Sequence, residues 1–579
     1  MTRGQVNFGH ALARFRSSGL TWDKLGIALA SGEFRERRYP SHFPPGAAQR
    51  HARHGRCRQH AEQRPLQAKS SAPAPAAGWP FASMRDYIAA LDKAGLVVRI
   101  PRIDQDEFEA AALFYRMRDE HGMRGAPTLI FAEVRIDGKW RKGPLLVNES
   151  GHLDAECMAF GLAPVSEWPL TKVPYNSYRK ARGHVEKLLA DNGGEYPLIA
   201  PTEIAATDAH CKEVILRGDD IDLTHFAFIK CNPGDAGRYI NTANVFTRHP
   251  TYGVNVGTYR CHLRGPREIA LNTEPGQTGY RHLMAARDRG EKIAKVSMAL
   301  TCDPYVWMVA GSKMAYGSKG FADELSIAGG LAGRSLQIVR SETNDFMVPA
   351  HAEMIIEGEV PLDDMRPEGP YGEMVGYQGR RKEEVFWVRV TAVTHRREPW
   401  LMNNFTGAQA GSLMAASHAR SFLRLKKAQP TVIDYFDDTR AVGFTCISIR
   451  KDQPGRGMEV AQHVAKANFF SKIVVVVDED IDVTNQEQIL AAMGARWQPF
   501  GSTEVYESQP ALPLDPSTEK LGRGSKIAID ATRKWPEENG PSVFPPMNRT
   551  LLEKGAPEAF ARVDRQWGEL VRNWRPAKR

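Results

Sequence analysis

The sequence predicts a mixed α/β protein in three parts: an N-terminal α/β unit, a β-rich, barrel-like middle domain and a C-terminal α/β domain. Three patterns predict this order: a capped helix followed by a strand near residue 84, short strands between about 210 and 400, and an apolar strand followed by a helix near residue 473. A chain of 579 residues is too long for one hydrophobic core. We therefore expect domains over residues 84–205, 206–405 and 406–579.

The first 83 residues differ in composition from the rest. They contain 13 Lys and Arg against 4 Asp and Glu, whereas residues 84–579 carry 64 of each sign. They also lack sustained apolar periodicity. We predict a disordered basic tail or a start assigned upstream of the true one, with a mitochondrial-type presequence as a minor alternative. Since residues 84–579 are balanced in charge, no nucleic-acid partner is expected.

Cysteine usage and apolar runs predict a cytoplasmic protein. Seven cysteines are scattered without paired spacing, and no secretory apolar segment opens the sequence. No run approaches the roughly 20 apolar residues of a membrane helix. Nucleotide-binding glycine loops, a GxSxG elbow and an HExxH zinc motif are also absent from the sequence, which disfavours Rossmann redox chemistry, nucleotide hydrolysis and serine hydrolysis.

The expected N-terminal unit begins with SMRDYIAALDKAGLVVRI. Ser83 can cap a helix with Asp86 three residues later, Tyr87, Ile88 and Leu91 share a face, and Gly95 ends the helix before a strand. This order predicts a helix followed by a strand.

The middle domain is predicted from strands such as YGVNVGTYRCHL and VFWVRVTAVTHR. In the second, Phe386, Val388, Val390 and Ala392 alternate with polar or larger residues, as in a half-buried strand. The C-terminal domain is predicted from SKIVVVVDEDID and a following helix. We expect a capping box from Thr484 to Glu487, with Ile489, Leu490, Met493 and Trp497 on the buried side.

The segment RPEGPYGEMVGY, at residues 366–377, is the densest cluster of unusual residues. Glu368 and Glu373 are five apart, a spacing that neither a strand nor a helix brings together. The intervening prolines and glycines predict a tight turn that can direct both carboxylates into one cavity. A surface turn with two solvated acids fits the local sequence as well.

Arg260 and Asn255 lie on a predicted strand, where Arg260 could clamp a carboxylate and Asn255 could offer an amide oxygen to a metal. An arginine at the surface of a strand is the simpler alternative. Glu324 precedes an apolar helix, where complementing the helix dipole would explain it. Lys472 leads the apolar strand of the C-terminal domain, where a solvated lysine at a strand end is common.

Together these blocks resemble the UbiD family of prenylated-flavin (de)carboxylases, the 3-octaprenyl-4-hydroxybenzoate carboxy-lyase type, in kind and in order. The resemblance rests on MRDYIAALDKAGLVVRI, DAGRYINTANVFTR, NVGTYR, ADELSIAGG, TNDFMVPAHAEMIIEGEV, RPEGPYGE, THRREPW and SKIVVVVDEDID, and extends from about Met84 to Trp535.

The resemblance implies a flavin-reductase-like split β-barrel between an N-terminal α/β unit and a C-terminal α/β domain. It implies prenylated FMN supplied by a separate flavin prenyltransferase, a divalent metal, usually Mn²⁺, and often K⁺. It also implies a homo-oligomer, a dimer or a hexamer, with no membrane span.

Several site residues follow from the resemblance alone. Arg260, Glu368 and Glu373 match the catalytic trio: Glu368 orients Arg260, Arg260 holds the substrate carboxylate and Glu373 donates the proton. Such a donor must be protonated when it acts, so its pKa should lie above the usual range. Residues matching the flavin site are Thr258, Tyr259, Arg260, Gln277, Thr278 and Lys472. Asn255 and Glu324 match metal ligands.

One departure affects the metal site. The family usually carries a histidine in a PGQH-like block after this arginine, whereas EPGQTGYRH places Thr278 there and His282 one helical turn later. We therefore retain Gln277 and Thr278 as flavin-side candidates and His282 as a metal candidate.

The predicted activity is reversible, non-oxidative decarboxylation of an aromatic or α,β-unsaturated carboxylic acid. A carboxylase, or one subunit of a multi-subunit aromatic carboxylase or decarboxylase, fits the same residues. A catalytically inactive flavin-binding scaffold is the alternative from another functional class.

Overall fold

The computed structural model of the protein describes residues 78–574 except 166–174, 313, 315, 318, 319, 322, 439 and 519–521. By compactness the chain divides into Met1–Ser70 and Ser71–Arg579, and every described residue belongs to the second unit. The prediction of a basic tail therefore lies outside the described residues up to residue 77. None of the helices in the described part combines the length and apolar character required to cross a bilayer.

The N-terminal part is built around a four-stranded sheet in the order β1-β2-β3-β17. β1 and β2 are parallel, β2 and β3 antiparallel, and β3 and β17 parallel. Its last strand therefore comes from a segment that follows the barrel in sequence. The bounds are β1 (Val97–Asp104), β2 (Thr128–Ile136), β3 (Lys139–Val147) and β17 (Leu401–Asn403).

The helices of this part are α2 (Met84–Lys93), α3 (Glu109–His121), α4 (Asp154–Ala159) and α5 (Tyr175–Asp191). The predicted start of α2 is confirmed. Ser83 Oγ accepts from the Asp86 N–H (3.3 Å), and the Asp86 carboxylate accepts from the Ser83 N–H (3.0 Å). Two orphan donors at the helix start are thereby satisfied.

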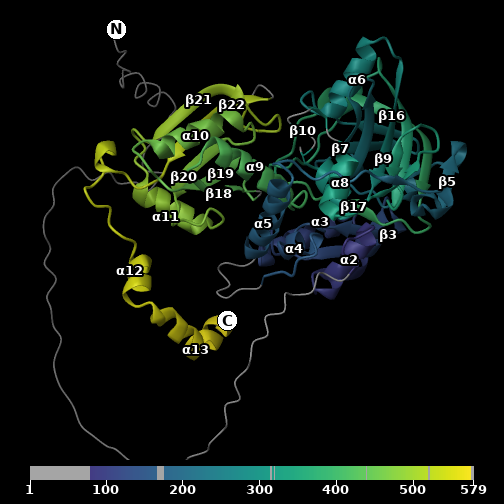
Figure 1. Cartoon of the computed structure of the whole chain (residues 1–579). Helices are drawn as coiled ribbons and strands as arrows, with labels where there is room; N and C mark the ends of the chain where they lie inside the picture. Colours follow the sequence, from purple (N-terminus) through teal and green to yellow (C-terminus); the bar gives the residue numbers. More distant parts are fainter. Residues whose placement is uncertain are drawn as a thin grey trace, which may run out of the picture. The chain divides into compact units, whose positions relative to one another are not determined.

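Six antiparallel strands close into a barrel in the order β14-β9-β6-β7-β8-β16, with β16 pairing back to β14 (Figure 1). The predicted barrel-like middle is confirmed, and on β16 Phe386, Val388, Val390 and Ala392 are buried as expected. The bounds are β6 (Tyr239–His249), β7 (Gly253–Gly265), β8 (Glu268–Leu271), β9 (Ile293–Leu300), β14 (Met354–Pro361) and β16 (Lys382–His395).

Several short strands and helices are attached to the barrel or follow its strands in sequence. β5 (Val214–Arg217) and β15 (Arg366–Glu368) both pair with β16. Helix α6 (Thr278–Asp288) connects β8 to β9. The remaining elements are α7 (Pro304–Ala310), α8 (Glu324–Ala332), the hairpin β10 (Tyr316–Gly317) and β11 (Gly320–Phe321), and the sheet of β4 (Thr202–Glu203), β12 (Gln337–Arg340) and β13 (Met347–Pro349).

The C-terminal part contains a mixed five-stranded sheet in the order β18-β19-β20-β22-β21. Its inner strands are parallel, and β18 and β21 are antiparallel edges. The four valines of β20 are fully buried, and α10 packs against β20 and β22 (Figure 1). The bounds are β18 (Val432–Asp437), β19 (Phe444–Ile449), β20 (Ile473–Asp478), β21 (Thr503–Pro510), β22 (Arg523–Asp530), α9 (Ala415–Ala428), α10 (Arg456–Ala467), α11 (Gln486–Arg496), α12 (Asn548–Gly555) and α13 (Glu558–Asn573).

Two details predicted for α11 are wrong. The capping residue is Asn485, whose Oδ1 accepts from the Gln488 N–H at 3.2 Å, because Thr484 instead hydrogen-bonds Asp482 in the preceding turn. The buried face follows Ile489, Ala492 and Arg496, spaced three and four apart. Leu490 lies about 100° around the helix from Ile489. It is therefore 66% exposed rather than buried.

Candidate active site

A buried arginine joins two carboxylates at the end of the barrel where β15 pairs with β16. Arg260 on β7 donates through Nη2 to Glu368 Oε2 (2.8 Å) and through Nε to Glu368 Oε1 (3.4 Å). Its Nη1 donates to Glu373 Oε1. Glu368 is 1% exposed, Glu373 6% and Arg260 9%. The structure thus brings together the three residues predicted to be catalytic, and neither a surface arginine nor solvated acids describe them.

The turn between the two glutamates explains how five residues of separation become a shared partner. β15 ends at Glu368, and Gly369, at φ +87°, begins the reversal. Asp235 holds the turn from outside: its Oδ1 accepts from the Gly372 N–H (2.8 Å) and from Gln378 Nε2 (3.1 Å). Glu373 donates its own N–H to the Tyr377 carbonyl (2.9 Å). The backbone is therefore fixed on both sides of Glu373.

Aromatic side chains enclose the charged cluster. Tyr239 on β6 donates its hydroxyl to Glu368 Oε1 at 2.7 Å. Its ring stacks on His262 (4.7 Å between centroids) and lies 4.4 Å from the ring of Tyr371. The Tyr371 ring also lies 4.9 Å from the Arg260 guanidinium carbon, a cation–π contact. This packing excludes water and strengthens the charge interactions inside it.

Burial sets the protonation of these groups. It raises the pKa of Glu373, opposed by the charge and hydrogen bond of Arg260 and assisted by Glu368 and Asp235. Burial alone would lower the pKa of Arg260, but Glu373 and Glu368 raise it, so the guanidinium stays charged. Burial, with Arg264, lowers the pKa of His262 to about 4, so that ring is neutral. The cluster therefore holds one permanent cation beside two acids.

The predicted flavin-side residues occupy two adjoining elements. Thr258 and Tyr259 are on β7, and Gln277 and Thr278 open α6. The Tyr259 hydroxyl accepts from the Gly279 N–H at 3.0 Å, which joins the two elements. The N-terminus of a helix favours a phosphate group because its first N–H groups are not used within the helix.

The predicted metal ligands come from three elements. Asn255 on β7 is buried, and its Nδ2 has no hydrogen-bond partner within the described part of the chain. Burial raises the pKa of Glu324 on α8 to about 8. Hydrogen bonds from backbone N–H groups, including that of Val256 on β7, lower this pKa but do not offset the effect of burial. A cavity of about 430 Å³ borders Glu324. His282 on α6 lies with Nδ1 3.2 Å from Thr247 Oγ1, and Thr247 faces Asn255 across the β6–β7 ladder.

No cluster of three or more His, Cys, Asp or Glu side chains able to hold a metal occurs within residues 78–574 as far as they are described. A metal here would therefore be held by Glu324 and the amide oxygen of Asn255, with either His282 or the hydroxyl of Thr278 as a further ligand. Such oxygen donors suit a hard divalent cation.

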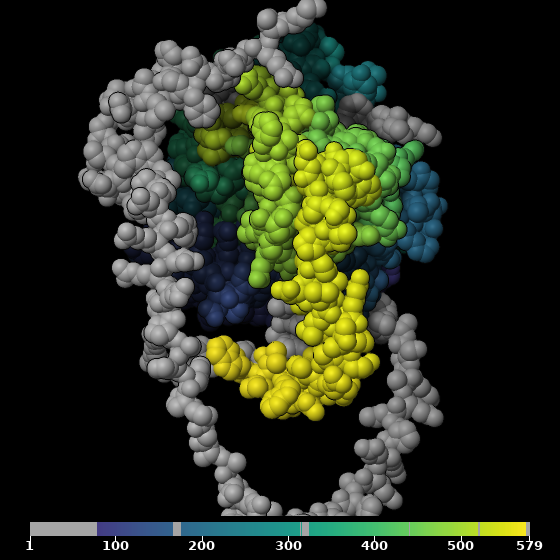
Figure 2. All heavy atoms as spheres, turned by 90° about the vertical axis from the view of Figure 1, so that its left-hand side faces the viewer, coloured from purple at the N-terminus to yellow at the C-terminus, as the bar shows by residue number. Residues whose placement is uncertain are grey.

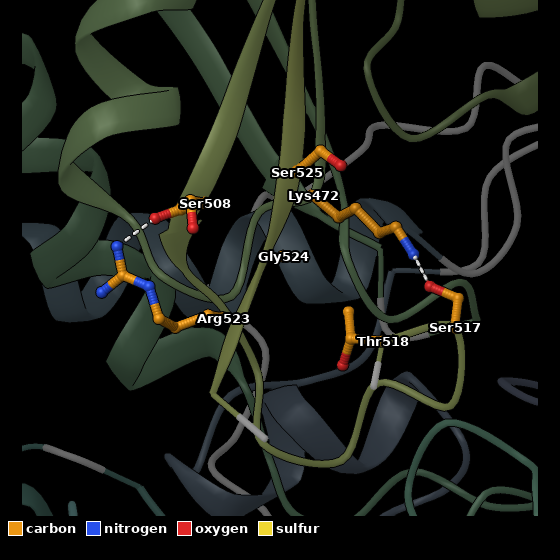
Figure 3. Close-up of a pocket in the computed structure, with 7 residues that line it drawn as sticks. All are labelled: Lys472, Ser508, Ser517, Thr518, Arg523, Gly524 and Ser525. Atoms are coloured by element: carbon orange, nitrogen blue, oxygen red, sulfur yellow. Dashed lines mark hydrogen bonds between the residues drawn. The ribbon is translucent and has the colours of Figure 1, made fainter. Parts of the chain in front are cut away.

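Lys472 lies in a separate cavity of the C-terminal part. The cavity has a volume of about 270 Å³ and is lined by Lys472, Ser508, Ser517, Thr518, Arg523, Gly524 and Ser525 (Figure 3). Lys472 Nζ donates to Ser517 Oγ (2.6 Å) and pairs with Asp515 (2.9 Å). Its contacts in this structure are therefore with its own domain, and its predicted contact with a flavin phosphate stays a prediction.

Comparison with known proteins identifies the family. A family model described as the 3-octaprenyl-4-hydroxybenzoate carboxy-lyase Rift-related domain matches residues 202–409, and a model of that carboxy-lyase's C-terminal domain matches residues 412–531. An uncharacterized protein of Archaeoglobus fulgidus is 30% identical over 370 residues, 62% of this chain and 74% of that protein. The chain belongs to the UbiD family.

Solved UbiD-class structures share its fold. HmfF from Pelotomaculum thermopropionicum in complex with FMN is 26% identical, with 81% of this chain and 98% of that chain covered and a TM-score of 0.66. An evolved dimeric form of that enzyme in complex with prFMN is also 26% identical, with 82% and 98% covered and a TM-score of 0.65.

Three residues around the UbiD-type site were not singled out from the sequence: Tyr239, Asp235 and Lys382. Lys382 on β16 is the cross-strand partner of Glu368, and its Nζ contacts Glu274 and Asn272 Oδ1 (3.0 Å). Tyr239 and Asp235 belong to the DAGRY block, whose place in the UbiD-like order was the only available signal. Nothing local in the sequence indicates Lys382.

Proposed function

We propose that this chain is a carboxy-lyase that uses prenylated FMN to decarboxylate, reversibly, an aromatic or α,β-unsaturated carboxylic acid. The observation that carries the proposal is the buried position of Arg260 between Glu368 and Glu373. One cation can bind a carboxylate there while one of two acids delivers a proton. Membership of the UbiD family supports the same activity.

Arg260 is the carboxylate clamp of the proposed reaction. Glu368 accepts from both Nε and Nη2 and so fixes the plane of the guanidinium. Nη1 faces Glu373 and is the donor that a substrate carboxylate would share. A planar guanidinium held in this way presents its donors in a fixed direction, which a lysine cannot do.

Glu373 is the proposed proton donor. When the bond between the substrate carbon and its carboxylate breaks, CO₂ leaves and the electron pair stays with the carbon. The Glu373 O–H bond then breaks and a C–H bond forms, so Glu373 must be protonated before this step. Burial, which raises the pKa of Glu373, favours that state.

Bound prenylated FMN would supply the electron sink for the carbon that loses CO₂. Relatives solved with FMN and with prFMN support this cofactor. The chain's contribution would be Thr258, Tyr259 and Arg260 on β7, with Gln277 and Thr278 at the start of α6.

We propose that the predicted metal ligands would hold a divalent metal, Mn²⁺, with K⁺ as a second ion. Asn255 would contribute the oxygen of its buried side-chain amide, and Glu324 would contribute a carboxylate. His282 or Thr278 on α6 would complete the set.

The proposal is tested by co-expressing the chain with a flavin prenyltransferase and recording the mass and absorbance of the bound cofactor. The chain expressed without the prenyltransferase is the control. Prenylated FMN bound only after co-expression is the expected result. Recovery of unmodified FMN, or of no flavin, from the co-expressed chain would overturn the proposal.

We also propose that the chain forms a homo-oligomer through α13. Apolar residues recur along this helix and the residue after it at positions 560, 563, 567, 570, 571 and 574, one face of a helix. Trp567 is 55% exposed, Leu570 56% and Trp574 66%. Figure 2 shows this C-terminal segment in yellow. A UbiD-class relative solved in an evolved dimeric form supports assembly.

A further inference from the structure

The two carboxylates that share Arg260 differ in how many hydrogen bonds they accept. Glu368 accepts from Arg260 Nη2 (2.8 Å), from Arg260 Nε (3.4 Å) and from the Tyr239 hydroxyl (2.7 Å). Within the described residues, the side chain of Glu373 accepts only from Arg260 Nη1. A hydrogen bond to the charged form of an acid stabilises that form. Glu368 is therefore the better anion of the two.

Tyr239 contributes the bond that separates the two acids most clearly. Its side chain enters from β6, whereas Arg260, on β7, serves both carboxylates. Burial, and then the charge of Glu368, raise the pKa of Tyr239, so its hydroxyl keeps the proton that it donates. The Pro370 carbonyl lies farther from the same hydroxyl, at 3.4 Å, and competes less well.

Packing fixes the direction of the Tyr239 hydroxyl. The ring is fully buried, stacks on His262 with 15° between the planes, and lies against Tyr371. These contacts involve the ring alone, so replacing the hydroxyl by hydrogen leaves them in place.

Other titratable groups lie near Glu368 and Glu373, but none of those in the described part of the chain donates a hydrogen bond to Glu368 alone, as Tyr239 does. Asp235 raises the pKa of Glu373 and also that of Tyr239. His262 is neutral, and Lys382, whose pKa burial and Arg260 lower to about 7, donates to Asn272 and Glu274.

We infer that Tyr239 is a positioning residue that keeps Glu368 charged and paired with Arg260, and so leaves the mobile proton of the site on Glu373. Its catalytic meaning rests on the proposed function, because only a decarboxylase needs Glu373 as the proton donor. The effect of Tyr239 on the charge of Glu368 does not depend on substrate or cofactor, so it can be measured in the chain alone.

Infrared titration of single carboxyl groups tests the inference. The spectrum of the Glu368→Gln/Glu373→Gln chain is subtracted from that of the Glu373→Gln chain, which leaves the carboxylic C=O band of Glu368. The intensity of this band is then measured as a function of pH to give the titration midpoint of Glu368. The same band is then followed in Glu373→Gln/Tyr239→Phe. Loss of one hydrogen bond to a charged group is expected to raise the midpoint by about one pH unit or more.

A matched control removes another buried tyrosine hydroxyl. Tyr196 is 4% exposed and donates to the Ala416 carbonyl at 2.9 Å, so Tyr196→Phe removes a similar bond without touching Glu368. This control should leave the midpoint unchanged. An unchanged midpoint in the Tyr239→Phe chain, or an equal rise in the control, would overturn the inference.

A second variant covers the case in which Tyr239→Phe does not fold. Site-specific replacement of Tyr239 by 3-fluorotyrosine keeps the hydroxyl and makes it a stronger donor, so the Glu368 midpoint should fall; a midpoint that stays or rises would overturn the inference. Because neither measurement uses cofactor or substrate, a chain that releases no CO₂ refutes the proposed function while leaving the Tyr239 result readable.

Discussion

Gly379 lies directly against the side chain of Glu373. A Cβ added at Gly379 would lie 2.6 Å from Glu373 Cγ and 2.7 Å from its Oε1. The Gly379 N–H donates to the Tyr371 carbonyl at 2.7 Å, so the backbone there cannot move away without losing a bond. Position 379 must therefore lack a side chain if the carboxyl of Glu373, the proposed proton donor, is to occupy its observed place.

Replacing Gly379 by alanine is expected to displace the Glu373 carboxyl and lower kcat by about 10- to 100-fold, because a shift near 1 Å strongly reduces proton transfer. Steady-state decarboxylation kinetics of the cofactor-loaded chain measure this. Gly183→Ala on α5, where an added Cβ meets no atom within 4 Å, is the control. Equal kcat in the Gly379→Ala and wild-type chains would show that Glu373 is not held by this contact.

Replacing Arg260 by lysine should lower kcat/KM by about 100-fold, since lysine retains the charge but not the two-donor contact with Glu368. The control is Arg389→Lys on β16, an exposed arginine that pairs with Glu359. Kinetics of both loaded variants provide the comparison. A loss below about threefold would argue against a clamp that requires the guanidinium.

Activity should decline as pH rises through the pKa of Glu373, which burial raises, because the donor must carry its proton. The profile of kcat against pH should show this alkaline limb in the wild type, and Glu373→Gln should lack net decarboxylation at every pH. A wild-type rate that keeps rising with pH would exclude an acid in this role.

The same shift predicts a pH-dependent stability. A folded-state pKa above the unfolded value of about 4.5 stabilises the fold fully below that value, and the contribution is lost as pH rises through the folded pKa. The unfolding free energy of Glu373→Gln relative to wild type should therefore increase with pH across this window. Urea unfolding at several pH values measures the difference, and a constant difference would contradict the shift.

Metal binding should respond to Glu324 and to position 278. Glu324→Gln should weaken Mn²⁺ binding, whereas Thr278→His should strengthen it by adding an imidazole ligand. Metal content after dialysis against defined free Mn²⁺ measures both. His282→Ala is measured in the same way: weaker Mn²⁺ binding in this variant would identify His282 as a ligand, and unchanged binding would favour Thr278. Unchanged affinity in Glu324→Gln would remove Glu324 from the site.

The apolar face of α13 predicts its own variant. Trp567→Glu should shift the chain toward monomer in light scattering coupled to size exclusion. Arg565→Glu, an exposed polar position on the same helix, should not. The same mass for Trp567→Glu as for wild type would place the interface elsewhere.

The sequence predicted the capped start of α2, the alternation of β16 and the barrel-like middle because each depends on local periodicity and turn chemistry. It misassigned Leu490 and the cap of α11, since Asp482 engages Thr484 in a turn that propensity does not reveal. β17 could not be foreseen in the N-terminal sheet, because its pairing with β3 joins segments more than 250 residues apart.

The residues of the candidate site also differ in how far the sequence could predict them. Glu368 and Glu373 stood out through the turn between them, and their convergence on Arg260 followed only from the family resemblance. Tyr239 and Lys382 reach the site through strand pairing, which no local pattern encodes.

The most direct test of the account is CO₂ release from a panel of aromatic and α,β-unsaturated carboxylic acids by the chain loaded with prenylated FMN, run in D₂O. The account predicts that at least one acid is decarboxylated, with one solvent deuterium in the product, and that Glu373→Gln loses this conversion. A fully loaded wild-type chain that converts none of these acids, or a Glu373→Gln chain that converts them at the wild-type rate, would contradict it.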